Sequence, residues 1–178
     1  MNKKKAPTIY IDVDGTLTEW NEKAGPDLWS LAKYIWMCVV MPNMIRAVQI
    51  IFDNWIGEVK FLTASISDEA STEKIEFLKR HIRKRLPKNS VIIVPYGQKK
   101  TDFVDATNGI LIDDYTKNLF DWEEAGGAGA IKVRNNINGR NGTWNGSSVH
   151  YQQAPESIAQ TILAEAYFIY NKEEIGWV

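Results

Sequence analysis

The sequence contains few of the residues that place a protein in an oxidising compartment or a membrane, or that build histidine-rich metal sites. Cys38 is the only cysteine among 178 residues, which excludes an intramolecular disulfide and fits a reducing cytoplasm. The two histidines, His81 and His150, have no metal-ligating residue at a useful spacing. The most apolar stretch, residues 35–51, is interrupted by proline, asparagine and arginine, so it is not expected to span a bilayer. These absences favour a cytoplasmic protein without membrane contact.

Neither sign of charge predominates in the chain. The net charge is −1 and the sequence pI is about 6.1, so no overall attraction to nucleic acid or membrane is expected. The basic residues at positions 79–88 follow several glutamates and are interpreted as the solvated end of a helix rather than a nucleic-acid patch. Lysines at positions 3–5 precede alanine and proline, without the apolar segment of a signal peptide. The length suits a single domain, residues 1–178.

Short apolar runs alternate with amphipathic segments along the chain. Five runs predict buried strands, at residues 9–11, 59–63, 91–94, 109–112 and 129–133. Apolar side chains at helical spacing predict helices, at residues 44–55, 68–86, 116–125 and from 155 onward. This alternation indicates an α/β fold with a parallel sheet of about five strands. The intervening residues 135–146 are rich in asparagine and glycine and are predicted to form turns.

Two pairs of carboxylates follow predicted strands. Asp12 and Asp14 come at the end of the first strand, and Gly15 then allows a sharp turn. Asp113 and Asp114 follow another strand in the same way. Ligands of parallel sheets bind at the carboxyl ends of the strands, so both pairs are expected in one crevice. The pairs would repel each other without a cation, and Mg²⁺ prefers such oxygen ligands.

Hydrogen-bond donors accompany the carboxylates. Thr63 ends the second predicted strand, and Lys99 and Lys100 lie in the loop that precedes the strand of the second acidic pair. Hydroxyl and ammonium groups are suited to phosphate oxygens. A phosphate group held beside a metal ion is therefore the expected ligand.

This order of motifs resembles the haloacid dehalogenase (HAD) superfamily of phosphohydrolases. The matching residues are Asp12-Val13-Asp14-Gly15-Thr16 for the first motif, Thr63 for the second, Lys100 (or Lys99) for the third and Asp113-Asp114 for the fourth. The resemblance implies a three-layer Rossmann-like core and a Mg²⁺-dependent phosphomonoesterase that forms an aspartyl-phosphate. Within the superfamily, residues 111–132 look most like the 5′(3′)-deoxyribonucleotidase type C family, which implies a small phosphorylated substrate, a nucleoside monophosphate.

The resemblance also implies roles for single residues. Asp12 would be the nucleophile and Asp14 the general acid and base, and an acid at the latter position favours hydrolysis over phosphate storage. Phosphate would be bound by Thr63, Ala64, Ser65 and Lys100. Mg²⁺ would be held by Asp12, the backbone carbonyl of Asp14, Asp113 and Asp114. Asp114 is the expected direct ligand of the metal, whereas Asp113 would contact metal-bound water or Lys100.

Residues 20–41 form a short insertion where one HAD subclass carries a cap over the active site. Trp20, Trp29 and Trp36 in this segment are candidates for stacking on a nucleobase, although packing or a subunit contact is an alternative. An open site needs a cover, so a homodimer through this segment is predicted.

Other functions remain open. A small cap would also admit a sugar phosphate or the phosphorylated end of a polynucleotide. A phospho-receiver module uses similar residues but carries its aspartate on a middle strand, whereas Asp12 follows the first. A HAD-like binding protein without activity is disfavoured because all the expected acids are present.

Overall fold

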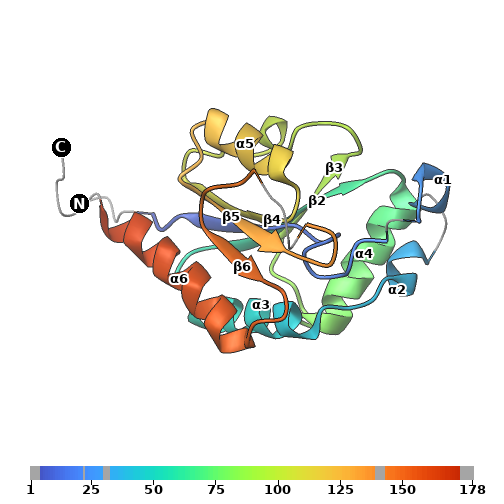
Figure 1. Cartoon of the computed structure of the whole chain (residues 1–178), viewed down its shortest axis with the longest axis horizontal. Helices are drawn as coiled ribbons and strands as arrows, with labels where there is room; N and C mark the ends of the chain where they lie inside the picture. Colours follow the sequence, from blue (N-terminus) through green and yellow to red (C-terminus); the bar gives the residue numbers. More distant parts are fainter. Residues whose placement is uncertain (1–4, 22, 30–32, 139–142, 173–178) are drawn as a thin grey trace.

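The computed structural model describes residues 5–21, 23–29, 33–138 and 143–172, and contains a six-stranded parallel sheet (Figure 1). The strands are β1 (Thr8–Ile11), β2 (Val59–Ser65), β3 (Val91–Pro95), β4 (Gly109–Asp113), β5 (Gly129–Arg134) and β6 (Ser148–His150). Their order is β3-β2-β1-β4-β5-β6, the doubly wound arrangement with β1 and β4 in the centre. The prediction of a parallel α/β fold is confirmed.

The sheet has one strand more than the five predicted. β6 pairs with β5 over three residues, from Ser148 to His150. Only Val149 of this strand is buried, so the segment is too short and too polar to show the apolar run that identified the other strands.

Helices cover both faces of the sheet and give three layers. They are α1 (Pro26–Trp29), α2 (Tyr34–Met37), α3 (Pro42–Asn54), α4 (Asp68–His81), the 3-10 turn η1 (Lys100–Asp102), α5 (Thr116–Glu124) and α6 (Pro155–Lys172). In Figure 1, α3 and α6 lie below the sheet and α5 lies above it. None of the helices within the described ranges is long and apolar enough to cross a membrane.

Alternation along the central strands separates two apolar cores. Ile9 and Ile11 of β1 belong to the larger core with side chains of α3, α4 and α6. Tyr10 points to the opposite face, where it meets Trp122 of α5 with ring centroids 5.3 Å apart. Trp144, from the predicted turn region, joins this second core and is buried. Both faces of β1 are therefore anchored, which holds its carboxyl end rigidly.

Local signals explain where α4 and α3 begin. Ser67 caps α4 by accepting a hydrogen bond from the backbone N–H of Ala70 at 3.1 Å. Pro42 opens α3 within its first turn, where a missing N–H has no cost. The helix predicted over residues 68–86 ends earlier, at His81. The proline at position 87 disfavours a helical conformation at Leu86, so the last predicted residue could not belong to the helix.

Candidate active site

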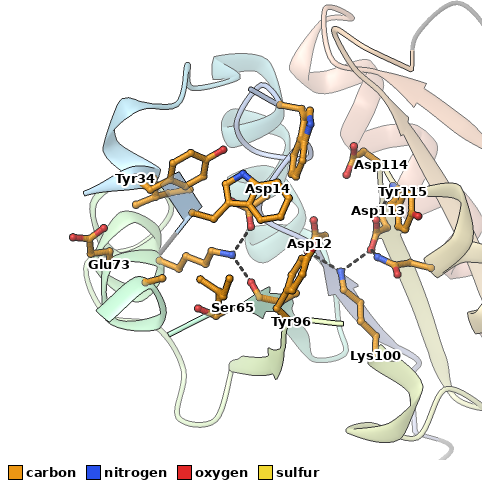
Figure 2. Close-up of a pocket in the computed structure, with 18 of the residues that line it drawn as sticks. Asp12, Asp14, Tyr34, Ser65, Glu73, Tyr96, Lys100, Asp113, Asp114 and Tyr115 are labelled. Atoms are coloured by element: carbon orange, nitrogen blue, oxygen red, sulfur yellow. Dashed lines mark hydrogen bonds and ion pairs between the residues drawn. The ribbon is translucent and has the colours of Figure 1, made fainter. Parts of the chain in front are cut away.

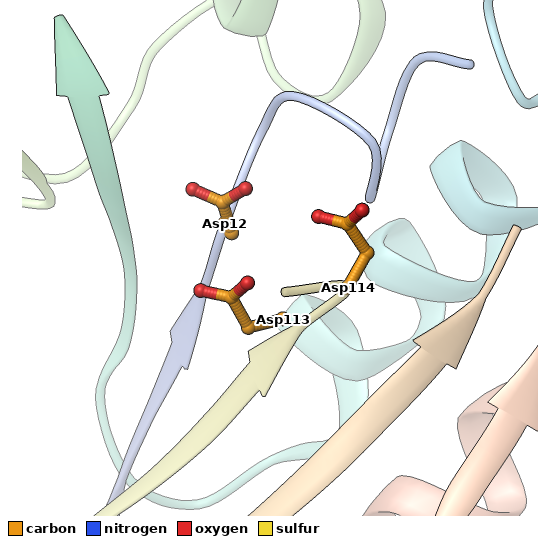
Figure 3. Close-up of side chains that lie close together, drawn as sticks. All are labelled: Asp12, Asp113 and Asp114. Carbon is orange, nitrogen blue, oxygen red and sulfur yellow. The ribbon is translucent and has the colours of Figure 1, made fainter. Parts of the chain in front are cut away.

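Three carboxylates meet at the carboxyl end of the two central strands. Ile11 pairs with Ile112 across β1 and β4, so Asp12 and Asp113 leave the sheet side by side. One carboxylate oxygen from each of Asp12, Asp113 and Asp114 lies within 4.8 Å of the other two (Figure 3). Asp12 is buried and Asp113 has no exposed surface. The parallel sheet thus brings together acids that are about 100 residues apart in the chain.

Of the two adjacent lysines, only Lys100 reaches this cluster. Its Nζ donates to Asp12 Oδ1 at 2.7 Å and to Asp113 Oδ2 at 2.6 Å (Figure 2). Lys99 lies at the surface and forms an ion pair with Asp121 at 3.2 Å. The two possibilities for the motif lysine are therefore distinguished by geometry: Lys100 is the one in the site.

The two acids of the second pair have different hydrogen-bond partners. Asp113 accepts from the backbone N–H of Tyr115 at 2.8 Å and, through its other oxygen, from Lys100 and Asn118. In the described part of the chain, Asp114 accepts on Oδ2 alone, which leaves Oδ1 available. The geometry therefore favours Asp114 as the direct metal ligand.

Asn135, which the sequence indicated only as part of a turn, holds this arrangement together. It is buried, and its Nδ2 donates to Asp114 Oδ2 at 2.8 Å and to the carbonyl of Gly15 at 2.9 Å. Gly15 has a φ of 73°, and a Cβ there would lie 2.4 Å from Asp114 Oδ2. Asn135 follows β5 directly, and this position at a strand end was the signal that could have identified it.

The end of β2 provides the predicted phosphate-binding segment. Ala64 and Ser65 line a cavity above the carboxylates, whereas Thr63 is fully buried. The Ser65 hydroxyl donates to the carbonyl of Ser67 at 3.0 Å. The Thr63 hydroxyl instead accepts from Lys74 Nζ at 3.3 Å.

The cavity has a volume of about 440 Å³ and largely apolar, aromatic walls. Its aromatic lining consists of Trp20, Trp29, Tyr34, Tyr96 and Tyr115. Trp29 lies between Trp20 and Tyr96, with centroids 5.4 Å from each. The floor is formed by the carboxylates and Lys100, so a polar floor lies below an aromatic wall.

Comparison with known proteins concerns the fold. No family model and no curated protein match the sequence. The chain is similar to the solved structure of D,D-heptose 1,7-bisphosphate phosphatase from Burkholderia thailandensis, with a TM-score of 0.55 and 13% identity over 89% of this chain and 99% of that one. It is also similar to a protein assigned as a HAD-like phosphatase from Mesorhizobium loti, with a TM-score of 0.59 and 14% identity over 93% and 88% of the two chains. The fold is HAD-like. Nothing in these comparisons distinguishes the type C deoxyribonucleotidases from other members, so that resemblance stays a prediction.

Residues 20–41, predicted to be a cap insertion, contain the two short helices α1 and α2, which lie near α4 in Figure 1. Positions 22 and 30–32 of the insertion lie outside the described residues. Of the three tryptophans expected to contact substrate, Trp36 does not line the cavity. It packs on Phe77 at 5.9 Å and beneath the guanidinium of Arg80 at 4.7 Å, because α2 presents it to α4.

Burial and mutual repulsion raise the pKa values of acids in the candidate site. Burial raises the pKa of Asp12 to about 7; Lys100 opposes this rise, and Asp113 and Asp14 add to it. Burial, with Asp113 and Asp12, raises the pKa of Asp114 well above its ordinary value. Burial lowers the pKa of Lys100, but Asp113 and Asp12 outweigh it and the net shift is upward. Lys100 alone therefore does not neutralise the negative charge of the three carboxylates. Their oxygen atoms are suitable ligands for a hard divalent cation such as Mg²⁺.

Proposed function

We propose that the protein is a Mg²⁺-dependent phosphomonoesterase that forms an aspartyl-phosphate at Asp12 and acts on nucleoside monophosphates. The observation that supports the phosphatase activity most strongly is the buried Asp12 carboxylate, held by Lys100 at the floor of the cavity. A nucleophile needs a fixed orientation beside a cation that stabilises the phosphoryl charge, and Lys100 provides both.

The proposed reaction has two steps. An oxygen of Asp12 forms a bond to phosphorus while the ester P–O bond breaks, and Asp14 protonates the leaving oxygen. Asp14 then accepts a proton from the water that attacks phosphorus, which breaks the bond to Asp12 and releases inorganic phosphate. Mg²⁺, held by Asp12, Asp114 and the carbonyl of Asp14, would offset the charge of the approaching phosphate.

The aromatic wall supports a nucleotide as the substrate. A nucleobase is planar and presents two π faces, and base–aromatic stacking is worth about 1–3 kcal/mol. Trp20 and Trp29 line the cavity together with Tyr96 and form a continuous aromatic wall. A sugar ring has no π face and presents only C–H groups to this wall, so a nucleobase matches the wall better.

Release of phosphate from three substrate groups tests the proposal. Nucleoside monophosphates, sugar phosphates and 5′-phosphorylated oligonucleotides are compared in Mg²⁺, and Asp12→Asn is the inactive control. Trp29→Ala is expected to raise KM about 5- to 100-fold for nucleotides and to leave KM for glycerol phosphate unchanged. Phe168→Ala is the matched control, since Phe168 is an aromatic residue outside the cavity lining with 66% of its surface exposed. Preference for sugar phosphates or oligonucleotide ends would contradict the substrate proposal only, whereas turnover by Asp12→Asn would contradict the covalent mechanism.

A further inference from the structure

A lysine occupies a buried position on the amphipathic helix α4. Ala70, Lys74 and Phe77 lie on the buried stripe of this helix, and Lys74 is only 6% exposed. A charged side chain on an apolar stripe is uncommon unless it is paired. This departure from the helical pattern was visible in the sequence, but the partner was not.

All three acceptors of Lys74 belong to the candidate active site. Its Nζ donates to Asp14 Oδ2, to the carbonyl of Ala64 and to Thr63 Oγ1, the last at 3.3 Å. A lysine ammonium has three N–H donors, so these three acceptors use all of them. Lys74 has no donor left for a phosphate oxygen. Among the described residues, Lys100 has two carboxylate partners and so retains one N–H donor.

Asp14 Oδ2 accepts a hydrogen bond from Lys74, whereas its other oxygen, Oδ1, has no donor among the described residues. Asp14 lines the cavity, and its Oδ1 is buried with no hydrogen-bond partner among the described residues. A buried carboxylate oxygen without a donor is costly, so such an atom indicates a partner supplied by a ligand. Because Lys74 holds Oδ2, the carboxylate cannot rotate freely and Oδ1 remains the oxygen for that partner.

We infer that Lys74 is a positioning residue that orients Asp14 for proton transfer and fixes it relative to the phosphate-binding segment at Ala64. This inference rests on the proposed phosphatase function. In the first step, the proton on Asp14 Oδ1 passes to the leaving oxygen, which keeps the electron pair of the broken P–O bond. Asp14 is then an anion beside the ammonium of Lys74, which offsets its charge. In the second step, Asp14 takes a proton from the attacking water, and Lys74 keeps its own protons throughout.

Leaving groups of different basicity separate this role from phosphate binding. An alkyl phosphate needs a proton on its leaving oxygen, whereas 2,4-dinitrophenyl phosphate releases a stable anion without one. Lys74→Met is expected to lower kcat for an alkyl phosphate about 100-fold. The burst of dinitrophenolate in a stopped-flow experiment should change less than about three-fold, since only water attack in the later step still needs Asp14. Lys74→Arg should restore part of the alkyl phosphate activity, and Lys79→Met, an exposed lysine on the same helix, is the matched control.

A double-mutant cycle keeps the inference testable if Lys74→Met is unstable. In an Asp14→Asn background, Lys74→Gln should cause no further loss, because Lys74 acts through Asp14. Additive losses in the cycle, or an equal loss of the burst and of alkyl phosphate turnover, would overturn the inference. So would full activity of Lys74→Met toward the alkyl phosphate. If the wild-type protein hydrolyses neither ester, the proposed function itself fails, and that outcome is recognisable without any variant.

Discussion

Replacing the proposed nucleophile should make the metal-free protein more stable. Asp12 lies with two other carboxylates within 4.8 Å, and burial raises its pKa from 3.8 to about 7. The folded state therefore holds a proton on Asp12 that the unfolded chain releases near pH 4. The stability of the wild-type protein decreases as pH rises from that value to about 7, and the full cost is present above pH 7. Asp12→Asn has no such proton and avoids this cost.

The size of the effect follows from the pKa shift. The rise from 3.8 to about 7 is roughly three units, each worth about 1.36 kcal/mol, so the upper limit is about 4 kcal/mol. Asp12→Asn also loses part of the bond to Lys100, so we expect a gain of about 2–3 kcal/mol at pH 8. For a chain of this length that corresponds to about 5–10 °C in Tm. At pH 5 the linkage cost is only about 1.6 kcal/mol, which the weakened bond to Lys100 offsets, so the two proteins should differ by less than about 1 kcal/mol.

Chemical denaturation in EDTA measures the free energy of unfolding of the wild-type protein and of Asp12→Asn at pH 5 and pH 8. Asp102→Asn is the control for an exposed aspartate. Mg²⁺ should remove most of the stability difference between the two proteins. The wild-type protein gains about 2.7 kcal/mol at a Mg²⁺ concentration of 100 times Kd, while Asp12→Asn loses a ligand. If Asp12→Asn is less stable than the wild-type protein in EDTA at pH 8, the electrostatic reasoning is refuted.

Three further predictions concern the site and the insertion. Lys100→Met should lower kcat/KM at least 1000-fold, whereas Lys99→Met should retain wild-type activity in the same phosphate-release assay; equal losses would contradict the assignment of the lysine. Asp114→Ala should raise the Mg²⁺ concentration needed for half-maximal activity more than Asp113→Ala does. Asp113→Ala should instead lower kcat, because it removes a hydrogen-bond partner of Lys100. The reverse order of effects would exchange the roles assigned to the two acids. The predicted homodimer through the insertion is tested by Met37→Glu, which introduces a charge at a side chain that is 60% exposed. Sedimentation should change from dimer to monomer, and a wild-type monomer at micromolar concentration would exclude the dimer.

The fold class could be predicted from the sequence because it depends on local periodicity. Apolar runs mark strands that are buried on both faces, and 3.6-residue spacing marks the helices that cover them. β6 was missed since three residues with a single buried side chain give no periodic signal. The meeting of Asp12 and Asp113 was also predictable, because the carboxyl ends of adjacent parallel strands always share one edge.

Side-chain direction and partners at long range could not be predicted in this way. Adjacent lysines have the same chemistry in the sequence, and only the path of η1 turns Lys100 inward and Lys99 toward Asp121. Lys74 is 60 positions from Asp14 along the chain, and its role depends on how α4 lies over β2. Trp36 could be counted with the other tryptophans by composition, but the packing of α2 on α4 removes it from the cavity.

The motif residues that meet at the edge of the sheet were predictable from the sequence, because strand ends and motif order are local properties of the chain. How Lys100 lies between two acids, and that Asn135 contacts Asp114 and Lys74 contacts Asp14, became visible only in the folded protein. Long side chains reach across several ångströms from elements that are distant in the sequence. Their contacts therefore depend on the packing of those elements, which no local pattern records.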